Sequence, residues 1–179
     1  MKTFLPYKDP LKEYKSSSTS LNRLADIADQ LPKLLLTNNV QKIINSLNTN
    51  DLSVGLLIKN KNIRELKLAM VQLSFISHAY IWGAKTPSKI LPEAIAKPWT
   101  QVANILGRPP ILSYASYCLD NWYRLNKKEG ISLENIGLLT NFLGGVDEDW
   151  FVTIHVCIED AAREAIAAAD SISKLNDKN

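Results

Sequence analysis

Apolar residues recur at helical spacing along most of the chain. From Ser20 onward, leucine, isoleucine and alanine return every three or four residues for about three turns, which predicts an amphipathic helix that Pro32 ends or kinks. A shorter pattern of the same kind covers residues 40–47. The longest predicted helix runs from about residue 62 to 82, and Gly83 is placed to end it.

Prolines and glycines divide the following part of the chain. The three prolines of TPSKILPEAIAKPW exclude one continuous helix, so Pro98 is expected in the first turn of a new helix that Gly107 ends. Another helix is expected over about 111–126, after GRPP, and the sequence KKEG then predicts a turn. Ser132 is placed to cap a short helix that ends near Gly144.

The last helical pattern begins at Asp147, an expected N-cap, and an alanine-rich stretch carries it to about Leu175. No segment alternates polar and apolar residues for long enough to predict a strand. Two prolines and a run of serines predict an extended N-terminal arm over residues 1–18. We therefore expect an all-α fold with at least six helices.

Composition and charge narrow the classes of function. The chain has 179 residues, of which 46% are hydrophobic, enough to form one good-sized core. Its net charge is +3 and the basic residues are scattered, so no nucleic-acid interface is predicted. No apolar run approaches membrane-spanning length and no secretory signal is evident. Cys118 and Cys157 lie in apolar stretches and are expected to be free thiols, so a cytoplasmic protein is predicted.

A histidine in the last helical pattern is the main candidate for chemistry. One stripe of that helix holds Phe151, His155, Ile158 and Ala162. The histidine is either a core residue that hydrogen-bonds a backbone carbonyl, which spacing alone favours, or a pocket residue beside an aromatic ring that holds a flat ligand. Glu159, one turn further on, is near enough to orient its ring.

Other candidate residues give weaker signals. His78 is interpreted as structural rather than as an axial metal ligand, because nothing near it supplies a second ligand. The two histidines and two cysteines lack the spacing of a zinc site, so no metal site is predicted from the residues themselves. Tyr114, Tyr117 and Cys118 are spaced to share one helix face, either as core or as the wall of an aromatic pocket.

Three long segments carry a resemblance to a known family: FISHAYIW, LPEAIAKPWTQVANILGRPPILSYASYCLDNW and LENIGLLTNFLGGVDEDWFVTIHVCIEDAAREAI. The opening FLPYKDPL follows the same pattern. Together they resemble the N-terminal half of the indoleamine 2,3-dioxygenases. The resemblance implies an all-helical protein, with a small helical domain over residues 19–145 and the first helix of a larger haem domain over residues 146–179.

The resemblance also implies a reaction and a set of contacts. Family enzymes use haem b and O₂ to open the indole ring of L-tryptophan, giving N-formylkynurenine, and the protein orients the substrate. By position, Tyr114 and Cys118 match walls of the pocket above the iron, and Phe151 matches the aromatic residue that stacks near the indole. His155 falls where family members have a serine or histidine close to the indole nitrogen. We therefore expect it to contact the substrate N–H or bound O₂.

One departure from the family pattern, the absence of its haem-ligating part from this sequence, leaves several interpretations open. By resemblance, the histidine that binds the haem iron from the proximal side lies beyond the counterpart of Asn179, as do the residues that bind the substrate carboxylate. Three accounts fit: a fragment, half of a split enzyme completed by a second polypeptide, or a decayed paralogue without catalysis. A non-enzymatic helical interaction module and a related haem enzyme acting on a modified tryptophan are the alternative functions.

Overall fold

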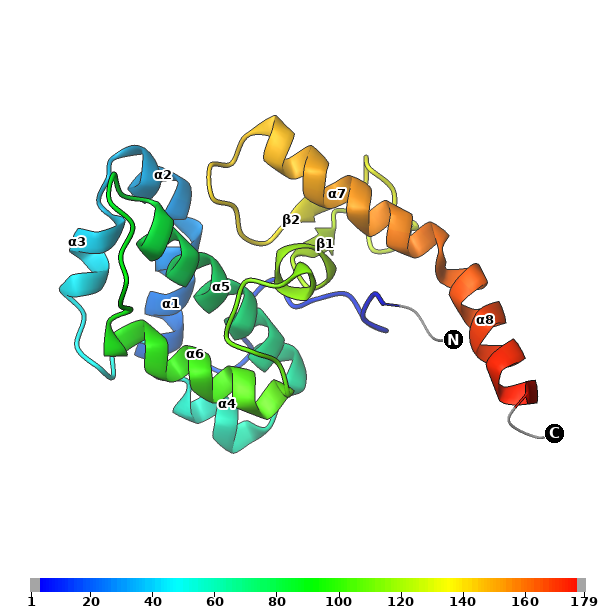
Figure 1. The fold of residues 1–179 in the computed structure, drawn as a ribbon, viewed down its shortest axis with the longest axis horizontal. Coiled ribbons are helices and arrows are strands. Elements are labelled where there is room, and N and C mark those ends of the chain that lie inside the picture. Colours follow the sequence, from blue (N-terminus) through cyan, green and yellow to red (C-terminus); the bar gives the residue numbers. More distant parts are fainter. Residues whose placement is uncertain (1–3, 177–179) are drawn as a thin grey trace.

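The structure of this protein is a computed structural model that describes residues 4–176, and helices dominate it (Figure 1). The elements follow in the order α1 (Thr19–Asp29), α2 (Leu31–Leu36), α3 (Val40–Asn45), α4 (Gly55–Asn60), α5 (Ile63–Trp82), α6 (Glu93–Leu106), the π-helix η1 (Ala115–Leu119), β1 (Trp122–Arg124), β2 (Ile136–Leu138), α7 (Val146–Ala161) and α8 (Arg163–Asn176). The predicted all-α class is confirmed, with one small sheet added.

The main core surrounds α5, which is buried on nearly all sides. Its residues from Glu65 to Ser77 all have low exposure except Lys67, and α1, α3 and α6 pack around it. On α6, the indole nitrogen of Trp99 donates a hydrogen bond of 3.1 Å to the hydroxyl of Ser74 on α5. Because α5 is largely apolar and is buried on most of its faces, it can serve as the central helix of a bundle.

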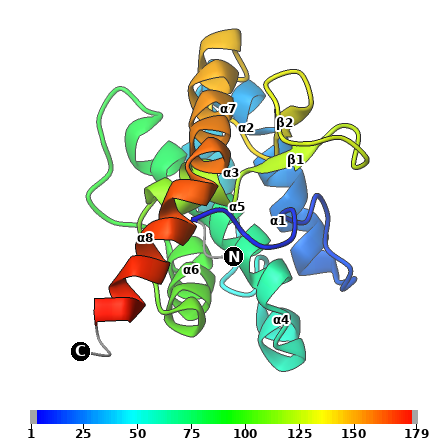
Figure 2. The ribbon, with the colours of Figure 1, turned by 90° about the vertical axis from the view of Figure 1, so that its right-hand side faces the viewer.

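A second, smaller core lies in the C-terminal part of the chain and connects it to the N-terminal arm. It is formed by Leu5, Cys118, Trp122, Ile136, Val152 and Val156. It therefore packs η1 and the sheet beneath α7, as Figure 1 shows, and anchors one end of the arm. Tyr117 contacts both cores and so connects them. Beyond α7, α8 points away from the rest of the molecule, at the right in Figure 1 and in front of the other elements in Figure 2.

The arm is held by a buried carboxylate. Residues 4–18 contain no helix or strand, and Glu65 on α5, which is 1% exposed, accepts hydrogen bonds from the backbone N–H groups of Lys15 (2.8 Å) and Ser16 (2.6 Å). The serine side chain at position 18 then caps α1 by accepting from the N–H of Leu21 at 3.2 Å. An extended segment is therefore fixed by polar contacts to the central helix.

The helices in the first half confirm most of the sequence prediction. The chain breaks between α1 and α2 next to Pro32, and α5 ends at Trp82 with Gly83 as its C-cap. Gly107 ends α6 in the left-handed conformation, with φ of 63°, as the glycine signal predicts. The prediction for Pro98 is wrong: α6 begins five residues earlier, at Glu93, and the proline lies inside it. The helix tolerates the lost hydrogen bond because its buried face packs on α5.

The predicted helix over 111–126 is also wrong. Only Tyr114 and the five residues of η1 are helical there, and β1 follows, paired antiparallel with β2 so that Trp122 pairs with Leu138. Asn121 explains the change of direction, because its amide group donates to the carbonyl of Thr140 and accepts from the N–H of Thr140, both at 2.9 Å. This two-way contact fixes the strands in place of a longer helix.

Two further expectations fail in the C-terminal part. The short helix that Ser132 was expected to cap is a turn leading into β2. The last helix begins at Val146 with Gly145 as N-cap, so Asp147 lies in its first turn, where its charge complements the helix dipole. The helix is interrupted at Ala162, a position without a proline or glycine to signal the break. The domain boundaries after residues 18 and 145 stay predictions.

Two expectations on class can be compared with the described residues. Over residues 4–176, none of the helices combines the length and the apolar character needed to cross a bilayer. Cys118 and Cys157 are both free thiols, as predicted.

Candidate functional site

Three of the four predicted site residues lie together on one face. The rings of Phe151 and His155, one turn apart on α7, have centroids 4.5 Å apart. Tyr114, which immediately precedes η1, meets His155 edge to face, with centroids 6.0 Å apart and planes at 75°. Since Tyr114 and Phe151 are 44% and 49% exposed, they form an open aromatic wall with the histidine between them. We call Tyr114, Phe151 and His155 the aromatic wall.

The hydrogen bonding of His155 determines which of its nitrogens is free. Its Nδ1 lies 2.6 Å from the carbonyl oxygen of Phe151. A carbonyl oxygen can only accept, so Nδ1 carries the proton in this contact. In the neutral ring Nε2 is then unprotonated and acts as a hydrogen-bond acceptor. The structural interpretation of His155 predicts a hydrogen bond to a backbone carbonyl, and the functional interpretation predicts a neighbouring aromatic ring. The structure shows both features.

Glu159 supports the wall in a way that the sequence did not predict. Its carboxylate accepts a hydrogen bond of 2.9 Å from the hydroxyl of Tyr114. We expected it to orient His155, but the ring nitrogen Nδ1 of that histidine is bound to Phe151 instead. Burial, and then the hydrogen bond to Glu159, raise the pKa of Tyr114 well above its ordinary 10.0. The tyrosine is therefore a neutral donor at physiological pH.

Cys118, the fourth predicted residue, lies behind the wall rather than on it. Its side chain is 0% exposed and belongs to the second core. Burial, followed by the nearby Glu159 charge, raises the pKa of its thiol to about 11, so the sulfur is protonated and a weak nucleophile. Tyr117, from the same π-turn, is half-buried and its ring lies 5.9 Å from that of Phe151.

An aromatic stack that no pattern in the sequence predicts lies behind the wall. Tyr117 stacks on Phe75 of α5, with centroids 5.5 Å apart and planes at 16°, and Phe142 lies 4.6 Å from Phe75. The loop that carries Phe142 is fixed by Glu148, whose carboxylate accepts hydrogen bonds from three consecutive backbone N–H groups at 142–144, at 2.7 to 3.1 Å. Rings from three separate segments therefore give the wall a rigid base.

His78 makes the backbone contact that is expected of a structural histidine, and its role stays a prediction. Its Nδ1 lies 3.0 Å from the carbonyl oxygen of Ser74, and its ring meets Trp99 edge to face at 6.0 Å. Burial lowers the pKa of His78 below its ordinary 6.5. No group of three or more histidine, cysteine or acidic residues within 4–176 is arranged to hold a metal ion. His78 and His155 thus make the same type of contact, from Nδ1 to the backbone carbonyl four residues earlier, in two different surroundings.

Comparison with known proteins identifies the relatives of this chain. The family model described as indoleamine 2,3-dioxygenase matches residues 1–179. The indoleamine 2,3-dioxygenase of Saccharomyces cerevisiae is 38% identical over 157 residues, which are 84% of this chain and 34% of that protein. Indoleamine 2,3-dioxygenase 1 of Rattus norvegicus and of Mus musculus are 33% and 34% identical, each over 82% of this chain and 35% of their own length.

The chain thus spans about a third of the length of the curated relatives that it matches. The match of the family model over the whole chain, and identities of 33–38% over most of it, agree with the helical fold and with the resemblance on which the aromatic wall was predicted. The chain belongs to the indoleamine 2,3-dioxygenase family.

Proposed function

We propose that this chain forms the substrate-side wall of a haem-dependent dioxygenase that opens the indole ring of L-tryptophan to N-formylkynurenine with O₂. Family membership supports the reaction class, and the aromatic wall supports the role of this part of the chain. The observation that carries the proposal is the free Nε2 of His155, an acceptor set between two partly exposed rings. An indole offers a flat apolar face and one N–H donor, the chemistry that these three side chains complement.

In this proposal the aromatic wall forms one side of a haem site, supported by family membership and by the exposed rings of Tyr114 and Phe151. Haem requires a strong axial ligand, and the family resemblance puts the proximal histidine outside these 179 residues. Neither His78 nor His155 has that position by resemblance. When bound, haem b would supply the iron chemistry that activates O₂. The residues of this chain would face the substrate, and we assign none of them to the iron.

Each wall residue has a distinct part in substrate binding. The exposed face of Phe151 would stack on the indole, and Tyr114 would close the other side of the histidine while Glu159 holds its hydroxyl. His155 would accept the indole N–H through Nε2 and thereby set the angle of the ring. Cys118 would pack behind the wall without contacting the substrate, because it is buried, and its neutral thiol would add no charge there.

Two further features of the proposal follow from composition and length. Free thiols at Cys118 and Cys157 are typical of reducing compartments, so we propose a cytoplasmic location. Because the chain spans about a third of the curated relatives, activity requires the remaining part of the family fold, and no comparison favours its supply by a second polypeptide.

The test is a chimera in which this chain replaces the matching segment of the Saccharomyces cerevisiae relative. His155→Ala should lower tryptophan turnover far more than haem retention, which is read from the Soret absorbance. His78→Ala is the matched control, because it removes an imidazole with the same backbone contact outside the wall. An equal loss of haem and turnover in His155→Ala, or equal effects of the two variants, would contradict the role of His155.

The exposed apolar side of the C-terminal segment favours a second candidate function, the helical interaction module. Val146, Trp150 and Ile158 are 83%, 57% and 54% exposed, a concentration that is typical of association surfaces. Two measurements together separate the two functions: sedimentation of the purified chain, which reports association, and turnover of the chimera. A non-catalytic module would self-associate or bind a partner and give no turnover in the chimera, whereas the dioxygenase wall would support turnover there.

A further inference from the structure

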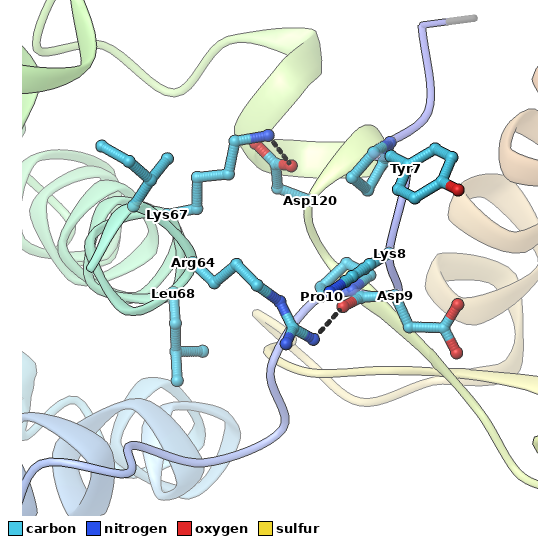
Figure 3. Close-up of a pocket in the computed structure, with 10 residues that line it drawn as sticks. Tyr7, Lys8, Asp9, Pro10, Arg64, Lys67, Leu68 and Asp120 are labelled. Atoms are coloured by element: carbon cyan, nitrogen blue, oxygen red, sulfur yellow. Dashed lines mark hydrogen bonds and ion pairs between the residues drawn. The ribbon is translucent and has the colours of Figure 1, made fainter. Parts of the chain in front are cut away.

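A cavity of about 280 Å³ lies between the N-terminal arm and the start of α5 (Figure 3). Arm residues 6–10 form one side, Ile63, Arg64, Lys67 and Leu68 form the other, and Asp120 completes it. We call this space the arm cavity. Its volume is near the lower end of the range of about 300–1,000 Å³ for small-molecule sites, so it suits a small ligand. None of the aromatic-wall residues lines it.

The carboxylates at the arm cavity are already neutralised. Asp120 is 3% exposed and binds two cations, Lys67 at 3.0 Å and Arg108 at 2.6 Å. The carboxylate of Asp9 binds the guanidinium of Arg124 at 2.8 and 3.1 Å, and Figure 3 shows it directed away from Arg64. No acceptor charge therefore remains for a further cation at this cavity.

Arg64 is a cation of the lining that is not paired with any carboxylate among the described residues. Its Nη2 donates a hydrogen bond of 2.7 Å to the backbone carbonyl of Asp9, a neutral acceptor. Its Nε is buried and has no hydrogen-bond partner among the described residues. Buried donors are almost always paired, and an unpaired guanidinium edge is costly. The lysine at position 8 adds another positive charge to the lining, so the net charge around the cavity is positive.

We propose that the arm cavity binds a small organic anion, a carboxylate with an apolar or aromatic body. The guanidinium edge of Arg64 matches the two oxygens of a carboxylate, which can accept from Nε and a neighbouring nitrogen together. Pro6, Pro10, Ile63 and Leu68 supply apolar contacts for the body of the ligand. Pro6 and Pro10 contribute no N–H donors to the arm. The Nε of Arg64 is therefore the buried donor at this cavity that is left for a ligand, with the ammonium group of Lys8 as a second positive charge.

Titration of the purified chain with benzoate, followed by ¹H–¹⁵N NMR, tests the proposal. Saturable shifts are expected at the amides of Asp9 and Lys67, and the neutral analogue benzamide should not produce them. Arg64→Gln should weaken benzoate binding about tenfold or more, because a charge-assisted contact is lost. Arg23→Gln is the matched control, since that arginine pairs with Asp51 on the surface and does not line the cavity, and it should leave binding unchanged.

A second variant keeps the test decisive if Arg64→Gln disturbs the arm. Ile63→Trp, at a position that is 49% exposed on the cavity, should block benzoate while every charge stays in place. The proposal is overturned if no saturable shifts appear, if benzamide binds as well as benzoate, or if folded Arg64→Gln or Ile63→Trp binds normally. Inorganic sulfate that gives the same shifts with equal affinity would indicate an adventitious ion only, and would also overturn it.

Discussion

The hydroxyl of Tyr114 donates a hydrogen bond of 2.9 Å to the carboxylate of Glu159, although 45 positions separate the two residues in the chain. The contact joins Tyr114, just before η1, to the second half of α7, and the same tyrosine ring also meets His155. It makes the tyrosine ring part of a fixed surface rather than a free side chain. The position of Tyr114 in the aromatic wall therefore depends on Glu159, a residue outside the wall.

Glu159→Gln should lower the pKa of Tyr114 toward 10.0 without restoring it fully. The carboxylate favours the neutral phenol, but burial is the larger cause of the raised pKa and persists in the variant. NMR titration of ring-labelled tyrosine measures this, with Tyr114→Phe to assign the signal. Glu164→Gln, at an exposed position on α8, is the control. An unchanged pKa of Tyr114 in Glu159→Gln would show that the hydrogen bond does not persist in solution.

The stability of the fold should fall at acidic pH through His78. Burial lowers the pKa of His78 below 6.5, so the unfolded chain binds the proton more readily than the folded one. The stabilisation is complete above pH 6.5 and is lost as the pH falls through the lower folded value. His78→Gln should remove this part of the decline. Thermal unfolding of both proteins over that pH window measures it, and parallel curves would refute the assignment.

Asp120→Asn should destabilise the fold by about 2 kcal/mol, because Lys67 and Arg108 lose their shared counter-charge. The value is below that of a fully buried pair since both cations are more than a quarter exposed. Urea unfolding gives the free energy. Glu93→Gln, which removes an exposed pair with Lys97 at 3.9 Å, should change it by less than about 0.5 kcal/mol. Equal effects would mean that burial at Asp120 contributes nothing.

Gly107→Ala should destabilise the fold by about 1 kcal/mol. The glycine ends α6 with φ of 63°, a left-handed conformation that a Cβ disfavours, while no atom lies within 4 Å of the added methyl group. Gly130→Ala is a matched control, because the space there is also open and its φ is not in the left-handed region. A loss of stability at Gly130 as large as that at Gly107 would rule out backbone strain as the cause.

The elements predicted from sequence are those with local signals. Helices α1 and α5 have long apolar periods, and Gly107 marks a helix end by its conformational freedom. Strands β1 and β2 have three residues each, too few for an alternating pattern to be recognised. Their pairing depends on contacts such as that of Asn121 with Thr140, which lie 19 positions apart and leave no periodic trace.

In the candidate site, too, the residues whose positions were predictable are those with a local signal. Phe151 and His155 are one helical turn apart, so their contact follows from spacing, and the aromatic character of Tyr114 was apparent. For Tyr114, Tyr117 and Cys118 the sequence left core and pocket wall as alternatives, and the structure buries Cys118 in the second core while Tyr114 stays exposed. Helical spacing could not separate them, because η1 is a π-turn whose angular spacing differs from that of an α-helix. The partner of Glu159 was assigned to the wrong residue since only its own helix was visible in the sequence.

The central claim is that His155 accepts the indole N–H of the substrate. The most direct measurement compares kcat/KM for L-tryptophan and for tryptophan methylated at the indole nitrogen, in the chimera and in its His155→Ala variant. We predict a preference for the unmethylated substrate that falls by about tenfold when the imidazole is removed, because the two changes delete the same hydrogen bond. If both proteins show the same preference, the two effects are independent and His155 does not contact the indole nitrogen.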